Sequence, residues 1–191
     1  EGGGTILFGP PKAGKSHILQ LIAFAISHGH SPLWPAVERR PVLYVNMERS
    51  ATEFKLRERA MRGILGVQGG SGIYYLHVRG LGLRVVAKKV TAWVKTQPAG
   101  VVLYDSISRA GLGALNDDST ANEWTDTANR VSKTWVAIAH TPRADGSHIF
   151  GSTHYEAGAD VLVKVSSEQR DTKLGVSLMV TQANATAKGG M

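Results

Sequence analysis

The segment Phe8–Leu19, FGPPKAGKSHIL, interrupts an apolar run with two prolines and a glycine and then returns at once to Lys-Ser and further apolar residues. Residues 9–16 of this segment, GPPKAGKS, match the pattern G-x-x-x-x-G-K-[ST]. In this pattern the glycines let the backbone curl so that successive N–H groups point at phosphate oxygens, and the following helix adds the positive end of its dipole. We therefore interpret the segment as a phosphate-binding loop, in which Lys15 reaches the β- and γ-phosphates and the Ser16 hydroxyl ligates Mg²⁺.

The sequence around this loop has the context that such a loop requires. Thr5–Gly9 is a short run of residues that favour strands, and Lys15–His28 is apolar on nearly every side, which indicates a buried helix. A plain Gly-rich turn, the alternative interpretation, would need neither element. We expect ATP and Mg²⁺ as cofactors. The residues predicted to bind the nucleotide are Gly9, Pro10, Pro11, Lys12, Ala13, Gly14, Lys15, Ser16 and His17.

Length and composition limit the class of protein. The 191 residues suffice for one domain with a sizeable core, so we expect a single domain over residues 1–191; because the chain opens at Glu1, we expect a piece of a longer protein. The longest apolar segment, Ile18–Ile26, is shorter than the ~18 residues that span a bilayer, so we expect a soluble, cytoplasmic protein with no membrane partner. The absence of cysteine excludes disulfides and thiolate metal sites. The net charge of +7 fits either a nucleic-acid partner or surplus surface lysine.

Strand and helix signals alternate along the rest of the chain, which predicts an α/β fold with a mostly parallel central sheet, helices on both faces and a C-terminal β-hairpin. The capping box Ser50–Glu53 opens a helix that we expect to end near Leu65, and Thr120–Glu123 is expected to cap another. A polar turn, Ser166–Thr172, is expected to join the hairpin strands. The other expected elements are strands at Pro41–Glu48, Ile73–Val78, Val101–Ser106, Trp135–His140, Asp160–Val165 and Leu174–Gln182, and a helix at Arg84–Thr96.

Two acidic residues stand at the ends of apolar strands. Asp105 closes VVLYD, and Glu48 follows the apolar run Val42–Met47. The carboxyl ends of parallel strands meet at the edge of the sheet where ligands bind, so we expect both carboxylates to lie near the phosphate-binding loop. There Asp105 can support Mg²⁺, and Glu48 can orient and deprotonate a water that attacks the γ-phosphate. Each residue also has a purely structural interpretation, as a group that complements a helix N-terminus.

The ordered set of segments resembles the RecA-like P-loop ATPases. It consists of the phosphate-binding loop, YVNMER with Glu48, VVLYDSISR with Asp105, VAIAHTPR with His140, and FGSTHYEAGADVLVKV. The resemblance runs from Gly4 to about Asn184. It is closest to the hexameric replicative helicases of the RepA and DnaB type and their AAA-like relatives. It implies a RecA-like ATPase fold and a helicase-type motor in DNA replication, which acts on single-stranded nucleic acid as a hexameric ring or filament.

The resemblance also implies roles for individual residues. It makes Glu48 the catalytic base, with Lys15 in the catalytic set, and it makes His140 the residue that senses the γ-phosphate and relays its state to the nucleic-acid loops. Arg143 and His148 fall where such proteins carry a mobile loop that faces the central channel, so both are candidates for contacts with the nucleic-acid backbone.

The arginine finger that such helicases place in a neighbouring subunit is missing from its usual positions. Residues 151–161 contain no arginine, and residues 181–184 contain neither lysine nor arginine. Arg170, Lys173 and Lys188 remain candidates for this role. The alternative function is a non-motor RecA-like recombinase or an ATP-gated regulatory or assembly protein. A P-loop kinase of small molecules is a third class, disfavoured because the chain shows no arginine-rich lid and Glu48 suits water activation.

Overall fold

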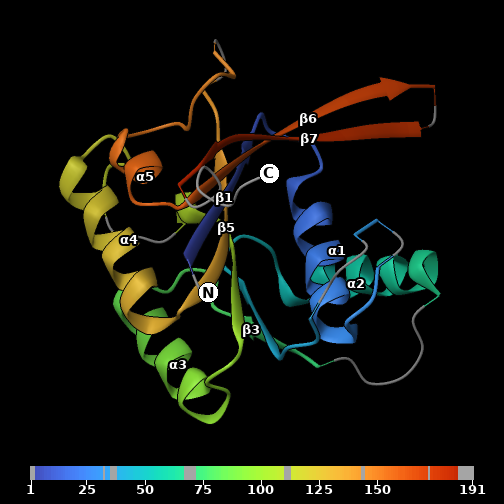
Figure 1. Cartoon of the computed structure of the whole chain (residues 1–191), viewed down its shortest axis with the longest axis horizontal. Coiled ribbons are helices and arrows are strands. Elements are labelled where there is room, and N and C mark those ends of the chain that lie inside the picture. Colours follow the sequence, from blue (N-terminus) through green and yellow to red (C-terminus); the bar gives the residue numbers. More distant parts are fainter. Residues whose placement is uncertain are drawn as a thin grey trace, which may run out of the picture.

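The protein is built around a seven-stranded sheet with helices on both of its faces (Figure 1). The computed structural model describes residues 3–31, 33–34, 38–66, 72–109, 113–142, 145–171 and 173–184. The strands are β1 (Gly3–Gly9), β2 (Val42–Asn46), β3 (Ile73–His77), β4 (Val101–Asp105), β5 (Thr134–His140), β6 (Val161–Arg170) and β7 (Lys173–Ala183). The helices are α1 (Lys15–His28), α2 (Ala51–Leu65), α3 (Leu83–Thr96), α4 (Asp118–Val131) and α5 (His154–Ala157), with the short 3-10 helix η1 (Ile107–Arg109) after β4.

The strand order is β3-β2-β4-β5-β1-β6-β7, in which every neighbouring pair is parallel except the antiparallel hairpin β6–β7. Strands β2 and β4 are buried along their whole length, as expected for parallel strands covered on both faces. The predicted α/β fold, with a mostly parallel sheet and a C-terminal hairpin, is confirmed.

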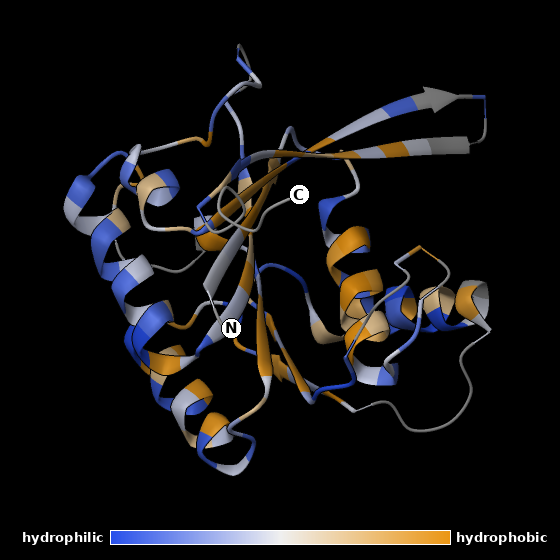
Figure 2. Ribbon diagram, in the orientation of Figure 1, coloured by the Kyte–Doolittle hydropathy of each residue, from blue (hydrophilic) through white to orange (hydrophobic). Residues whose placement is uncertain are grey.

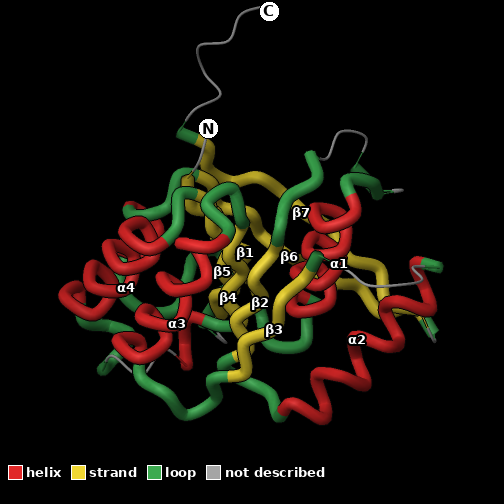
Figure 3. Tube along the Cα trace, turned by 90° about the horizontal axis from the view of Figure 1, so that it is seen from below, coloured by secondary structure: helices red, strands yellow, loops and turns green. Residues whose placement is uncertain are grey.

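Each face of the sheet has its own hydrophobic core. On one face α1 and α2 pack through Leu19, Phe24 and Phe54, and on the other α3, α4 and α5 pack through side chains such as Val86 and Trp124. Figure 3 shows the two helical layers on either side of the strands. Figure 2 shows that apolar residues concentrate in the strands and in α1, whereas α3 and α4 turn a polar side outward. The expectation that the helix from Lys15 is largely buried is thus confirmed.

Two of the expected local features are wrong. Helix α4 begins at Asp118 with Asp117 as its N-cap, so Thr120 is a buried residue of the first turn and not a cap. The expected turn at Ser166–Thr172 is mostly strand, because residues 166–170 pair with residues 173–177 in the hairpin ladder. Polar residues do not end a strand whose backbone groups find partners in a neighbouring strand and whose side chains reach solvent. None of the described helices is long and apolar enough to cross a membrane.

Gly4 is fixed by its neighbour across the sheet. It lies opposite Trp135 in the β1–β5 register, and a Cβ atom on Gly4 would lie 2.1 Å from the indole ring. That ring cannot retreat, because it is fully buried, packs edge-on against Trp124 at 5.1 Å between ring centroids and donates a 2.8 Å hydrogen bond to the Asn129 side chain.

We expect Gly4→Ala to lower the free energy of unfolding by about 1–3 kcal/mol, the usual range for overpacking a core. Urea denaturation measures this change. The matched control is Gly63→Ala in α2, where no atom lies within 4 Å of the added methyl group. Because alanine is the better helix former, this substitution should raise the same free energy by about 0.5–1 kcal/mol. Equal effects at the two positions would contradict the packing of Trp135 on Gly4.

Candidate functional site

The predicted phosphate-binding loop runs from the end of β1 into the first turn of α1. Gly14 caps this helix in the left-handed conformation, with φ of 87°, which a glycine adopts without strain. The helix start has no side-chain cap hydrogen bond, and its first turn contains no acidic residue. No side-chain cap therefore takes up the N–H groups of the first turn, and the positive end of the helix dipole faces the loop, which suits an anion.

Lys15 is buried inside this loop, with 5% of its surface exposed. Its ammonium donates hydrogen bonds to the carbonyl oxygens of Gly9 at 2.7 Å and Pro10 at 2.8 Å, and lies 3.3 Å from Nδ1 of His140. Burial lowers the pKa of Lys15 to about 8, although the carboxylates of Glu48 and Asp105 act in the opposite direction. The ammonium is therefore held inside the loop by the loop's own carbonyl groups.

Asp105 ends β4 beside the loop. Its Oδ1 accepts a 3.3 Å hydrogen bond from the Ser16 hydroxyl, and its Oδ2 accepts one of 2.8 Å from the Tyr44 hydroxyl in the neighbouring strand. Burial raises the pKa of Asp105, whereas the bond from Tyr44 lowers it. Burial also raises the pKa of Tyr44 well above its usual value, so that the phenol stays a donor. A hydroxyl and a carboxylate in contact are the hard oxygen donors that Mg²⁺ prefers, and this pair fits that ion.

Glu48 reaches the same edge of the sheet from β2. Strand β2 lies beside β4 with Asn46 opposite Asp105, so residues that follow the two strands are neighbours. The Ser106 hydroxyl donates a 3.2 Å hydrogen bond to Oε2 of Glu48. The buried Asn46 closes the turn, because its side chain accepts from the N–H of Arg49 at 3.0 Å and donates to the carbonyl of Arg49 at 2.9 Å. The Ser106 hydroxyl thus holds the Glu48 carboxylate, and Asn46 holds the backbone turn that carries Glu48.

The phosphate-binding loop and Glu48 line a cavity of about 350 Å³. Besides the loop, Glu48 and His140, it is lined by two arginines, Arg49 and Arg57, that the sequence did not identify as site residues. Arg57 is half-buried, and burial followed by the charge of Arg49 lowers its pKa, while Asp105 and Glu48 act in the opposite direction. Cationic side chains therefore outnumber the carboxylates that line the cavity, as a polyphosphate site requires.

A helical pattern could have identified Arg57. It lies three residues after Phe54, which is 1% exposed, so Arg57 shares the inward side of α2. Lys55 and Arg59, by contrast, lie on the exposed side of the same helix. The sequence signal for Arg57 was therefore its spacing of three residues from the apolar Phe54 in the predicted helix.

The remaining predicted residues are distributed as follows. Ala13 is buried, and His17 lines the cavity, where burial and then Arg57 lower its pKa. His148 lies on an exposed segment, and its Nδ1 is 3.1 Å from the carboxylate of Asp145, which adds a negative charge beside a residue predicted to contact phosphate. Arg143 and Lys188 lie outside the described residues, as do the side chains of Arg170 and Lys173.

Comparison with known proteins identifies a family and a fold. A family described as an AAA domain matches residues 1–146. The solved structure of a KaiC-like protein from the hyperthermophilic archaeon Pyrococcus horikoshii OT3 is similar to this chain with a TM-score of 0.68; the match covers 97% of this chain and 81% of that one, at 13% sequence identity. At this identity the similarity shows the fold alone. None of the curated proteins matches the chain.

The fold and the loop define a RecA-like P-loop ATPase. Since the family match covers more than half of the sequence, the chain belongs to the AAA domain family. The family and the fold establish this class without establishing a helicase.

The lowered pKa of Lys15 predicts how nucleotide binding depends on pH. With a pKa of about 8, the side chain loses its charge in the unliganded protein well below the ordinary value of 10.5. Because the charged form binds phosphate, we expect the affinity for ATP to be constant below this pKa and to fall above it, approaching about tenfold per pH unit. Equilibrium titration with a fluorescent ATP analogue between pH 7 and pH 9.5 measures the change.

The control for this prediction is Lys15→Arg. A guanidinium keeps its charge throughout this range, so the affinity of the variant, whatever its absolute value, should not change with pH. The same slope in both proteins would show that another group titrates.

Proposed function

We propose that the chain hydrolyses ATP with Mg²⁺ and couples hydrolysis to movement on single-stranded nucleic acid, as a helicase-type motor in DNA replication. In this proposal Lys15 and Ser16 hold the phosphates and the metal, and Asp105 supports the metal. Glu48 is the base that activates water, and His140 senses the γ-phosphate. The AAA domain family and the geometry of the site support the proposed hydrolysis.

One juxtaposition carries the proposed hydrolysis. Two carboxylates from adjacent strands reach the edge of the sheet beside the buried ammonium of Lys15, one on the hydroxyl of Ser16 and the other, Glu48, on the hydroxyl of Ser106. Glu48 is thus available as a base, while the carboxylate at Ser16 is engaged as a metal-supporting group. A P-loop ATPase needs this separation of roles, since phosphoryl transfer depends on positioning and on the stabilisation of charge.

The residues of this chain can carry the chemistry in the following way. Glu48 accepts the proton of the attacking water, and its hydrogen bond from Ser106 fixes the oxygen that remains. Lys15, with Arg57 from α2, faces the negative charge of the transferred group. Mg²⁺, when bound, supplies further positive charge between the phosphates.

His140 supports the proposed coupling to nucleic acid. Its Nδ1 lies 3.3 Å from the ammonium of Lys15, and its carbonyl oxygen accepts a 2.7 Å hydrogen bond from the N–H of Phe150. The end of β5 therefore touches both the phosphate-binding loop and the segment that contains His148. A change at the terminal phosphate has a short path to the segment where we propose nucleic-acid contacts. The net charge of +7 is compatible with such a partner.

A second candidate function is an ATP-gated regulatory or assembly protein, or a recombinase-like filament protein. Arg49 and Arg57 favour it, because they line the cavity from the same chain. A chain that supplies its own arginines does not depend on a finger from a ring neighbour. The helicase-type motor, in contrast, would act as a homo-oligomeric ring or filament.

We expect Lys15→Ala to abolish nucleotide binding, because it removes the buried cation of the loop. We expect Glu48→Gln to bind ATP with nearly unchanged affinity and to hydrolyse it at least about 10²-fold more slowly, the usual contribution of a positioned base. Calorimetric titration and phosphate release measure the two properties. Normal turnover in the Glu48 variant would place the base elsewhere, and unchanged affinity in the Lys15 variant would contradict the phosphate-binding loop.

The motor proposal predicts that single-stranded DNA raises the rate of ATP hydrolysis several-fold, and that the protein sediments as a ring-sized or larger assembly with ATP. Phosphate release with and without an oligothymidylate, alongside analytical ultracentrifugation, tests both expectations. A rate that DNA leaves unchanged, together with ATP-dependent binding of another protein, would instead support the regulatory candidate. Phosphate transfer to a metabolite would support the small-molecule kinase.

A further inference from the structure

A broad groove runs between α3 and α4, and it shares no residue with the nucleotide cavity. Its volume is about 930 Å³, more than twice that of the nucleotide cavity. It lies on the helical layer opposite α1 and α2, away from the phosphate-binding loop (Figure 1). The proposed function uses no part of this groove.

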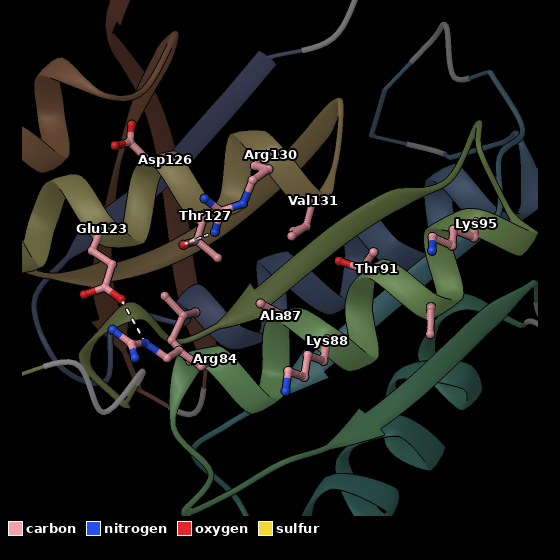
Figure 4. Close-up of a pocket in the computed structure, with 12 residues that line it drawn as sticks. Arg84, Ala87, Lys88, Thr91, Lys95, Glu123, Asp126, Thr127, Arg130 and Val131 are labelled. Carbon is pink, nitrogen blue, oxygen red and sulfur yellow. Dashed lines mark hydrogen bonds and ion pairs between the residues drawn. The ribbon is translucent and has the colours of Figure 1, made fainter.

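The floor of the groove is made of small apolar groups. Ala87 and Thr91 contribute methyl groups from α3, and Val131 and Thr127 contribute them from α4 (Figure 4). Small side chains at the junction of two helices let a third helix approach closely, and the methyl groups give its apolar side a surface to cover.

The rim of the groove is mainly cationic. Arg84, Lys88 and Lys95 lie at i, i+4 and i+11 along one side of α3, and Arg130 projects from α4 (Figure 4). The two carboxylates on the rim are Glu123 and Asp126.

Part of this charge is already balanced. Arg84 forms an ion pair with Glu123 at 3.5 Å. The guanidinium of Arg130 donates to the Thr127 hydroxyl at 3.1 Å, which fixes its position but does not balance its charge. Among the described residues, Lys88 and Lys95 form no ion pair, and both are exposed. The groove therefore presents two lysines whose charges are not balanced within the described part of the chain.

We propose that this groove binds an amphipathic helix of a partner protein, with acidic residues beside a narrow apolar stripe. The apolar floor would cover the stripe, and Lys88 and Lys95 would pair with the acids. Helix α3 has 14 residues and so is about 21 Å long, which sets the length of the partner helix. The two lysines are seven residues apart, so the matching acids should stand about two helical turns apart.

The chemistry of the groove disfavours two other occupants. A second copy of this chain would bring a net charge of +7 to a cationic surface. A single-stranded nucleic acid binds by stacking its bases on aromatic rings, and none of the described residues that line the groove is aromatic. An acidic protein segment satisfies both the apolar floor and the charged rim.

The test uses a dye-labelled synthetic helix of 14 residues with leucine and alanine on one side and glutamate on its flanks. Fluorescence anisotropy measures its binding to the full chain at low salt. We expect binding that weakens as salt rises, and a loss of affinity of about tenfold or more in the double variant Lys88→Glu/Lys95→Glu. The matched control, Lys55→Glu/Arg59→Glu on the exposed side of α2, changes the net charge equally and should shift affinity by less than about threefold.

Each alternative result has a defined meaning. Equal losses in the two double variants would overturn the proposal, because the peptide would then sense only net charge. So would undiminished binding of a peptide whose leucines are replaced by glutamine, since the floor would then not be used. A 15-nucleotide oligothymidylate could also bind more tightly than the peptide and lose this affinity in the Lys88→Glu/Lys95→Glu variant. That result would make the groove a nucleic-acid site. A sedimentation mass that falls in that variant would make it a contact between copies. Thermal unfolding midpoints confirm that each variant is folded.

Discussion

The buried ammonium of Lys15 is the interaction on which the rest of the site depends. Two carbonyl groups of the loop hold it, and two carboxylates, Glu48 and Asp105, lie close enough to oppose the loss of its charge. Those carboxylates would repel each other and a polyphosphate if no cation lay between them. The phosphate-binding loop and the two acidic strand ends therefore form one electrostatic unit. In this partly desolvated site the opposite charges offset the cost of burying one another.

The sheet keeps this unit in register. Strands β2 and β4 are buried from end to end and lie side by side, so that their last residues cannot shift relative to each other without breaking the ladder. Two polar side chains then align the reactive groups: Tyr44, within β2, holds Asp105, and Ser106, which follows β4, holds Glu48. These two residues serve the site by positioning other side chains, and they supply no reactive group of their own.

Much of the fold could be predicted from the sequence, because its signals are local. The pattern GPPKAGKS, the apolar strands and the capping box at Ser50 each specify a short piece of backbone, and the expected helix beginning at Lys15 is confirmed. The start of α4 and the length of the hairpin were wrong, because tertiary burial of Thr120 and cross-strand pairing of Ser166 outweighed local preference. Arg57 was missed, because its role depends on which side of α2 meets the sheet. The catalytic roles of Glu48 and His140 stay predictions.

The hairpin has a consequence for handling the protein. In the described part of the chain β7 is the last strand of the sheet, and Leu178, Met179 and Val180 are between 40% and 62% exposed along it. An edge strand with exposed apolar side chains can pair with a strand of another molecule, and such pairing leads to aggregation. We therefore expect self-association at high concentration to begin at this edge of the sheet.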